Sequence, residues 1–180
     1  MLIDAERSQL LLVDLQEKMM PAIVDEAAIV ANCRWLVEAA QMIGVPVAAI
    51  EHYAKGLGPL VPAIRELLAP GAVAAKNHFS SVAANCMAQL PGSDRAQCIV
   101  CGVEAHVCVL QTVLDLYQEG KEVFVVADSV GSRRASDRDL ALARLRQEGV
   151  RIVSREMVVF EWLGAAGTPL FKAVSKALLK

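Results

Sequence analysis

Residues 97–102 read Gln-Cys-Ile-Val-Cys-Gly, an almost unbroken apolar run. A strand that is buried on both faces has this pattern, and such strands belong to parallel sheets that are covered by helices. Similar runs occur at residues 9–14, 45–51, 72–76, 122–128 and 150–154. We therefore predict a mostly parallel sheet of six strands.

The segments between these runs have the apolar spacing of helices. Helices are predicted over residues 25–43, 61–68, 106–119, 136–148 and 169–180. Three of them are followed by Gly44, Gly120 or Gly149, and a glycine just past a helix end lets the chain turn. The alternation, with right-handed crossovers, predicts one domain over residues 1–180 that is a three-layer α/β/α sandwich.

The composition argues against several classes of protein. Hydrophobic residues make up 55% and charged residues 21%, which excludes intrinsic disorder. Lys+Arg 18 and Asp+Glu 20 give a net charge of −2, so neither a nucleic-acid partner nor a polybasic membrane surface is expected. The most apolar stretch, residues 37–50, is interrupted by polar residues and is too short to span a membrane.

The cysteines and the amino terminus indicate the compartment. The chain has five cysteines, an odd number, which is typical of free thiols and not of a disulfide framework. The first residues, Met-Leu-Ile-Asp-Ala-Glu-Arg, lack the pattern of a secretion signal. We therefore expect a cytoplasmic protein.

Three chemically complementary residues follow predicted strands. Asp14 ends the first run, Lys76 ends the third, and Cys108 lies in the first turn of the helix after the fourth. Ligands of such sheets bind at the carboxyl ends of the strands, so these side chains are expected at one edge. Taken singly, Cys108 is more typical of core packing, Asp14 of a helix N-cap and Lys76 of a solvated strand end.

Together these residues predict acyl transfer to a thiol, followed by hydrolysis. The positive end of a helix dipole favours the thiolate, so the pKa of Cys108 is expected to fall, and Lys76 would act in the same direction. Asp14 could take the thiol proton or later activate a water molecule. The backbone N–H of Cys108 could hold the developing oxyanion.

Three segments resemble the isochorismatase-like cysteine hydrolases. They are Leu-Leu-Leu-Val-Asp-Leu-Gln (10–16), Lys-Asn-His-Phe-Ser (76–80) and Cys-Gly-Val-Glu-Ala-His-Val-Cys (101–108). The resemblance covers residues 8–175 and is closest to the isochorismatase domain-containing branch. It implies a catalytic triad of nucleophile Cys108, base Asp14 and electrostatic partner Lys76.

The resemblance also implies further site residues and a homo-oligomer. A cis peptide between Val103 and Glu104 would turn the Glu104 N–H toward that of Cys108 and form an oxyanion hole. Gln16 and Phe79 would line the pocket. Family members are usually oligomers, and residues 160–163 with the C-terminal helix are the expected subunit contact.

Departures from other branches restrict the cofactor and the substrate. The nicotinamidase branch holds a metal through Asp-x-His and a second histidine, whereas this chain has Glu51-His52-Tyr53 at the corresponding place. No metal and no cofactor are therefore expected, and His52 is expected at the pocket mouth. Isochorismatase proper cleaves a vinyl ether, for which Cys108 has no obvious role. The predicted substrate is a small-molecule amide, imide or ester.

Other interpretations remain open. The chain could be a non-catalytic binding protein on the same scaffold, or a redox sensor in which Cys108 needs a resolving thiol such as Cys101. Cys98 and Cys101 have redox spacing but lie in a predicted strand, which favours core packing. Arg133-Arg134 is more typical of a solvated loop, with steering of an acidic substrate or a subunit contact as alternatives.

Overall fold

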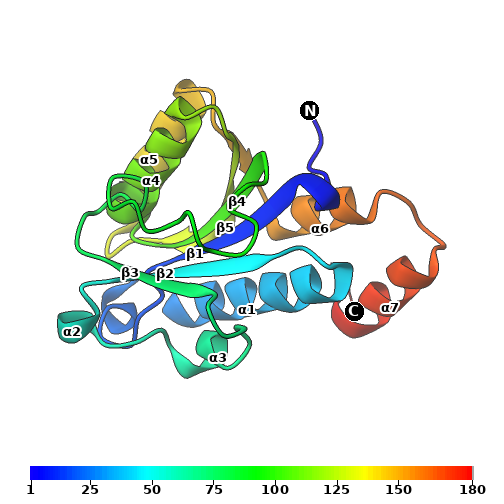
Figure 1. The fold of residues 1–180 in the computed structure, drawn as a ribbon, viewed down its shortest axis with the longest axis horizontal. Helices are drawn as coiled ribbons and strands as arrows, with labels where there is room; N and C mark the ends of the chain where they lie inside the picture. Colours follow the sequence, from blue (N-terminus) through cyan, green and yellow to red (C-terminus); the bar gives the residue numbers. More distant parts are fainter. Residues whose placement is uncertain (180) are drawn as a thin grey trace.

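The sheet contains six parallel strands in the order β3-β2-β1-β4-β5-β6 (Figure 1). The computed structural model describes residues 1–179 of the chain. The strands are β1 Ser8–Val13, β2 Val47–His52, β3 Val73–Lys76, β4 Gln97–Val103, β5 Glu122–Gly131 and β6 Arg151–Val153. Each overlaps one of the six predicted runs, so the predicted α/β fold with a parallel sheet is confirmed.

Helices cover both faces of this sheet. They are α1 Glu26–Ile43, α2 Ala54–Leu57, α3 Pro62–Arg65, α4 Leu110–Gln118, α5 Ala135–Gln147, α6 Arg155–Leu163 and α7 Pro169–Leu178, with short turns η1 Ala5–Arg7, η2 Met20–Ala22 and the π-helical η3 Ala105–Val109. Helices α4 and α5 lie on one face, and α1, α6 and α7 lie on the other (Figure 1). This is the predicted three-layer arrangement.

Two segments differ from the sequence prediction. Helix α6 was not predicted, and Ser154, the expected end of the last strand, is its N-cap. The Ser154 hydroxyl accepts a hydrogen bond from the Met157 N–H at 3.2 Å, which ends the strand and begins the helix. The predicted 61–68 helix is only the single turn of α3. In the predicted 169–180 helix, α7 ends at Leu178, and residue 180 lies outside the described part.

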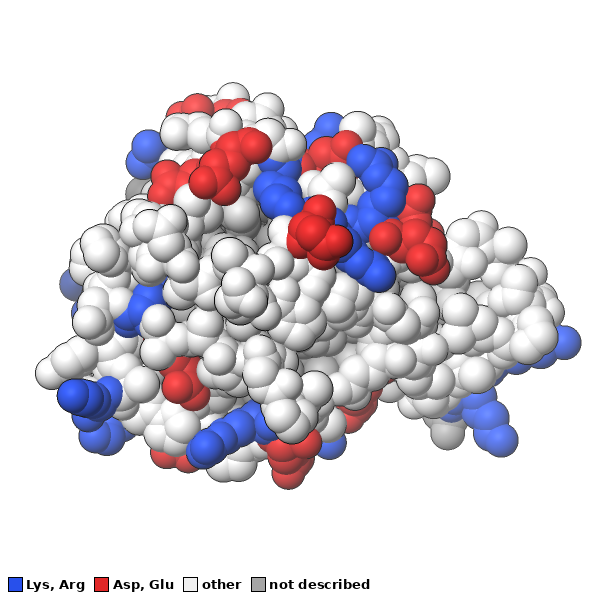
Figure 2. Space-filling view, viewed as in Figure 1, with Lys and Arg blue, Asp and Glu red and all other residues white. Residues whose placement is uncertain are grey.

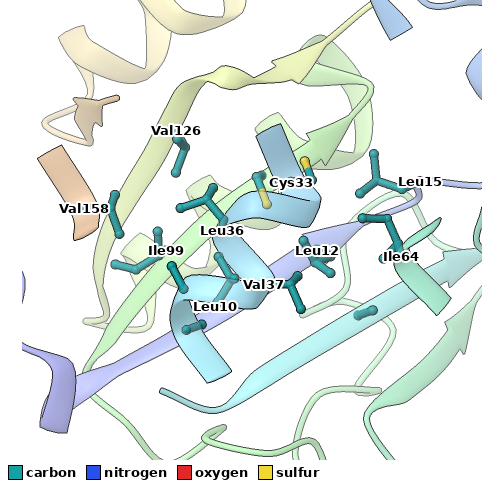
Figure 3. Packing of buried hydrophobic residues seen from close by; sticks show 14 of the residues in the cluster. Leu10, Leu12, Leu15, Cys33, Leu36, Val37, Ile64, Ile99, Val126 and Val158 are labelled. Atoms are coloured by element: carbon teal, nitrogen blue, oxygen red, sulfur yellow. The ribbon is translucent and has the colours of Figure 1, made fainter. Parts of the chain in front are cut away.

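The long helix α1 is fixed on the centre of the sheet by apolar packing. Its Cys33, Leu36 and Val37 lie against Leu10 and Leu12 of β1, and all five are fully buried (Figure 3). Burial of a leucine side chain contributes about 1.5–3 kcal/mol to folding. This packing holds β1, and therefore the loop that follows it, in a defined position.

The strand order leaves a crevice at the carboxyl ends of β1 and β4. The chain proceeds from β1 to β2 and β3 on one side, and from β4 to β5 and β6 on the other. The loops after β1 and β4 therefore diverge, and open α/β sheets bind ligands at such a place.

Gly102 of β4 lies opposite Val13 of β1 and has φ +120°, and a Cβ there would lie 2.1 Å from the Val13 carbonyl oxygen. The close approach brings Asp14 near the residues that follow β4.

Among the helices of residues 1–179, none is both long and apolar enough to cross a bilayer.

Candidate active site

Asp14 and Lys76 form a buried ion pair at the carboxyl edge of the sheet. Asp14 follows β1 with a left-handed backbone, φ +53°, and its N–H donates to the Ile50 carbonyl at 3.0 Å. Lys76 is the last residue of β3. Its Nζ lies 2.9 Å from Asp14 Oδ2, and both side chains are 0% exposed. The two residues therefore meet across β2, which separates their strands.

Cys108 lies beside this ion pair. It belongs to η3, the π-helical turn after β4, and is only 3% exposed. A carboxylate oxygen of Asp14, a ring nitrogen of His52 and the Cys108 sulfur all lie within 4.8 Å of one another. Asp14 Oδ1 is buried and has no hydrogen-bond partner among the described residues. An open acceptor is thus available close to the thiol.

The expectation that the pKa of Cys108 falls is wrong. Burial and the neighbouring Asp14 carboxylate raise the pKa of the Cys108 thiol to about 12, and Lys76 opposes them only in part. Burial also raises the pKa of Asp14 above its ordinary value of 3.8, although the Lys76 ammonium acts against the rise. The resting thiol is therefore neutral, and the ionised form of Asp14 is a stronger base than an exposed aspartate.

His52 and Phe79 both line the cavity beside Cys108. His52 ends β2, and its Nδ1 lies 3.4 Å from Lys76 Nζ. Burial, followed by the Lys76 charge, lowers the pKa of His52, so the ring is neutral near pH 7. The rings of His52 and Phe79 are tilted by 32° with centroids 5.5 Å apart.

The prediction that Gln16 lines the pocket is wrong. Gln16 is fully buried, and its side-chain amide donates to the carbonyls of His52 and Gly58, at 3.0 Å and 2.7 Å. Its Oε1 accepts the His52 N–H at 2.7 Å. Because both ends of the amide hold backbone groups, Gln16 fixes the wall that carries His52 and does not contact the cavity.

The pocket beside Cys108 has a volume of about 320 Å³. It is lined by Lys18, Met19, Ala22, His52, Leu57, Phe79, Glu104, Val107, Cys108 and Arg133. The sequence did not indicate Lys18 here, and for Arg133 it favoured a solvated loop over the alternatives of steering an acidic substrate or contacting a subunit. The available signal was that both residues follow strands, Lys18 after β1 and Arg133 after β5.

Glu104 connects the pocket to the loop after β5. The peptide between Val103 and Glu104 is cis, as the family resemblance implied. Glu104 Oε2 accepts hydrogen bonds from the Arg133 N–H at 3.1 Å and from the Arg133 Nε–H at 2.9 Å. The Glu104 N–H donates to no backbone carbonyl among residues 1–179. This N–H is therefore free to bind an oxygen atom of a ligand.

The Asp14, His52 and Cys108 cluster offers oxygen, nitrogen and sulfur atoms of the kinds that bind transition metals. The Lys76 ammonium, however, is bonded to Asp14 and lies next to His52 Nδ1. A divalent ion would have to displace this charge from a fully buried position. The Lys76 charge therefore favours a site without a metal ion.

A family model for the isochorismatase domain matches residues 8–157. The chain belongs to the isochorismatase family. Isochorismatase domain-containing protein 2 of Danio rerio is 40% identical over 173 residues, which cover 95% of this chain and 86% of that protein. The family resemblance seen in the sequence is therefore confirmed.

Solved structures of similar proteins have the same fold. The MAR1 ribonuclease of Caenorhabditis elegans has a TM-score of 0.90 and 34% identity, covering 100% of this chain and 93% of that one. YcaC from Pseudomonas aeruginosa, solved with hexane-2,5-diol and covalent acrylamide, has a TM-score of 0.85 and 25% identity, covering 99% and 92%.

Proposed function

We propose that this member of the isochorismatase family is a cysteine hydrolase that cleaves a small-molecule amide, imide or ester. One observation carries the proposal. The Cys108 sulfur lies within 4.8 Å of a buried Asp14 carboxylate oxygen, and one oxygen of that carboxylate has no partner among the described residues while the other binds Lys76. The nucleophile thus lines the pocket, and the base and the cation are buried beside it.

In the proposed first step, Asp14 removes the thiol proton as the sulfur attacks the carbonyl carbon. Because the pKa of Cys108 is about 12, proton transfer accompanies C–S bond formation and does not precede it. The backbone N–H groups of Glu104 and Cys108 hold the oxyanion. Asp14 then returns the proton to the departing amine or alcohol, leaving a thioester on Cys108.

In the second step, Asp14 accepts a proton from a water molecule that attacks the thioester carbon. The C–S bond breaks, the acid product leaves, and the proton returns to Cys108. Lys76 remains on Oδ2 throughout, where it orients Asp14 and favours the ionised form of the carboxylate before each proton transfer. The Pseudomonas relative with covalent acrylamide supports the presence of a nucleophile on this fold.

Intact-mass spectrometry with a panel of small activated amides, imides and esters tests the proposal. The wild type should gain one acyl group, and Cys108→Ala should gain none. Cys86→Ala is the matched control, because Cys86 is a partly exposed thiol that packs against the same apolar cluster as Cys108. Equal labelling of wild type and Cys108→Ala would refute Cys108 as nucleophile, and an unlabelled wild type would favour the non-catalytic binding protein.

The redox-sensor alternative loses its expected resolving thiol. Cys101 packs in the cluster on the α1 face of the sheet, whereas Cys108 belongs to the cluster on the α4 face. The sheet itself therefore separates the two sulfur atoms.

We further propose a cytoplasmic homo-oligomer. All five cysteines are free thiols, which is consistent with a reducing compartment. Phe160 of α6 and Leu170 of α7 are 48% and 39% exposed, in the region expected to form the subunit contact.

A further inference from the structure

We infer that Lys18 and Arg133 form an anion subsite at the mouth of the pocket, and that the substrate is a small acyl compound carrying a carboxylate close to the scissile carbonyl. The inference rests on the proposed function of Cys108 and adds the substrate class. Both cations line the same cavity as Cys108.

The charges around the cavity do not cancel. The buried carboxylate of Asp14 is paired with Lys76, and that of Glu104 is paired with Arg133. Lys18 forms no ion pair within residues 1–179, and its Nζ donates only to the Gly56 carbonyl, at 3.2 Å. The pocket therefore has an excess positive charge, although the chain as a whole has a net charge of −2.

The Arg133 side chain is 63% exposed, but it is held in place by Glu104. Glu104 Oε2 binds its backbone N–H and its Nε–H together. The neighbouring Ser132 is held by His106, whose Nδ1 lies 2.9 Å from the Ser132 hydroxyl, and by the Val24 N–H, which donates to the Ser132 carbonyl at 3.1 Å. The loop that carries the guanidinium group is thereby fixed from two segments, η3 with its N-cap Glu104 and the loop before α1.

The pairing with Glu104 leaves the terminal nitrogens of Arg133 available. Neither of its Nη atoms has a hydrogen-bond partner in the described part of the chain. These two N–H₂ groups can bind a carboxylate through parallel hydrogen bonds, which is the preferred geometry of an Arg–carboxylate pair. The Glu104 contact also leaves the guanidinium group little rotational freedom, which reduces the entropy lost on binding.

The cavity limits the size of this anion. A volume of about 320 Å³ holds a small molecule and not a polymer. Apolar side chains, namely Met19, Leu57 and Val107, line the same cavity. An acyl group with a short hydrocarbon spacer and a terminal carboxylate satisfies these features, with the carbonyl at Cys108 and the carboxylate at Lys18 and Arg133.

Two probe esters that differ only at the acyl end test the subsite. 4-Nitrophenyl hemisuccinate carries the carboxylate, and 4-nitrophenyl 4-methylpentanoate replaces it with an isopropyl group of similar shape. Because the hemisuccinate also cyclises to succinic anhydride, which has no free carboxylate, the acylation given by succinic anhydride alone is measured and subtracted. We expect wild-type Cys108 to be acylated at least about tenfold faster by the hemisuccinate, since hydrogen bonds to a charged group are worth this factor or more. Both rates are measured on the same protein sample. A lower amount of folded protein reduces the two rates equally and therefore does not change their ratio.

The variants and their controls locate the subsite. The ratio should fall toward one in Arg133→Gln and Lys18→Met, and Arg133→Lys should restore it only in part because lysine lacks the two-pronged geometry. Arg134→Gln and Lys55→Gln, exposed cations outside the pocket lining, should keep the wild-type ratio. A wild-type ratio near one, or a ratio unchanged in Arg133→Gln and Lys18→Met, overturns the subsite and leaves Cys108 chemistry intact. Failure of both esters to acylate Cys108 overturns the proposed function and the subsite together.

Discussion

Asp14 must be ionised to act as the base, so its pKa sets the acid limit of the reaction. Burial raises that pKa above 3.8, and activity should therefore decline at a higher pH than an exposed aspartate would allow. The pH dependence of acylation by the neutral 4-methylpentanoate ester measures this limit without titration of the probe. Asp14→Asn should lower the rate about 10²–10⁴-fold. Because the pKa of Cys108 is about 12, a rate that rises tenfold per pH unit from pH 7 to 9 would contradict the concerted proton transfer.

The Asp14–Lys76 ion pair is also expected to contribute to the stability of the fold. Lys76→Met leaves a buried carboxylate without its cation and should lower the free energy of unfolding by about 3–5 kcal/mol at pH 7. Since the folded-state pKa of Asp14 would then lie still higher, the loss should shrink as the pH falls and Asp14 becomes protonated. Denaturant titration at pH 7 and pH 5 measures both effects, with exposed Lys172→Met as control. The double variant Asp14→Asn/Lys76→Met should be more stable than Lys76→Met alone. If its loss of unfolding free energy instead equals the sum of the losses of the two single variants, the two residues do not interact.

At the scale of elements, the approach of β4 to β1 depends on Gly102. Gly102→Ala must place a Cβ 2.1 Å from the Val13 carbonyl oxygen at φ +120°. Gly44, after α1, has φ +91°, but a Cβ added there would meet nothing within 4 Å, so Gly44→Ala carries only the backbone cost of about 1–2 kcal/mol. Gly102→Ala should lose that amount and about 1–3 kcal/mol more from the forced separation of two central strands. The free energy of unfolding is measured by chemical denaturation. Equal losses for Gly102→Ala and Gly44→Ala would show that β1 and β4 can move apart without cost.

At the scale of the whole molecule, the proposed homo-oligomer predicts a subunit contact at α6 and α7. Figure 2 shows acidic and basic side chains clustered in the upper part of this face and others along its lower edge, with an uncharged area between them that continues toward α7. If α6 and α7 form the subunit contact, Phe160→Arg should shift the molecular mass in solution toward the monomer, because a charge buried at an interface is costly. Light scattering after size exclusion measures the mass. Leu140→Arg, at a 69% exposed position on α5, is the control and should leave the mass unchanged.

Much of the fold could be predicted because its signals are local. Buried parallel strands are apolar throughout, so all six runs are visible in the chain, and the carboxyl-edge rule brings Asp14, Lys76 and Cys108 into one hypothesis from the sequence alone. Helix α6 could not be predicted in the same way, because Ser154 reads as part of the preceding strand, which in the structure is only Arg151–Val153.

By itself, therefore, the sequence determined the parallel sheet and the residues that follow its strands, because apolar periodicity and chain order are properties of neighbouring residues. Only the tertiary structure decided the rise in the Cys108 pKa, the role of Gln16 in holding the wall, and the presence of Lys18 and Arg133 at the pocket mouth. These depend on burial and on charges from segments far apart in the chain. A helix dipole can be anticipated locally, but the water removed from Cys108 and the Asp14 carboxylate placed beside it follow from packing between elements.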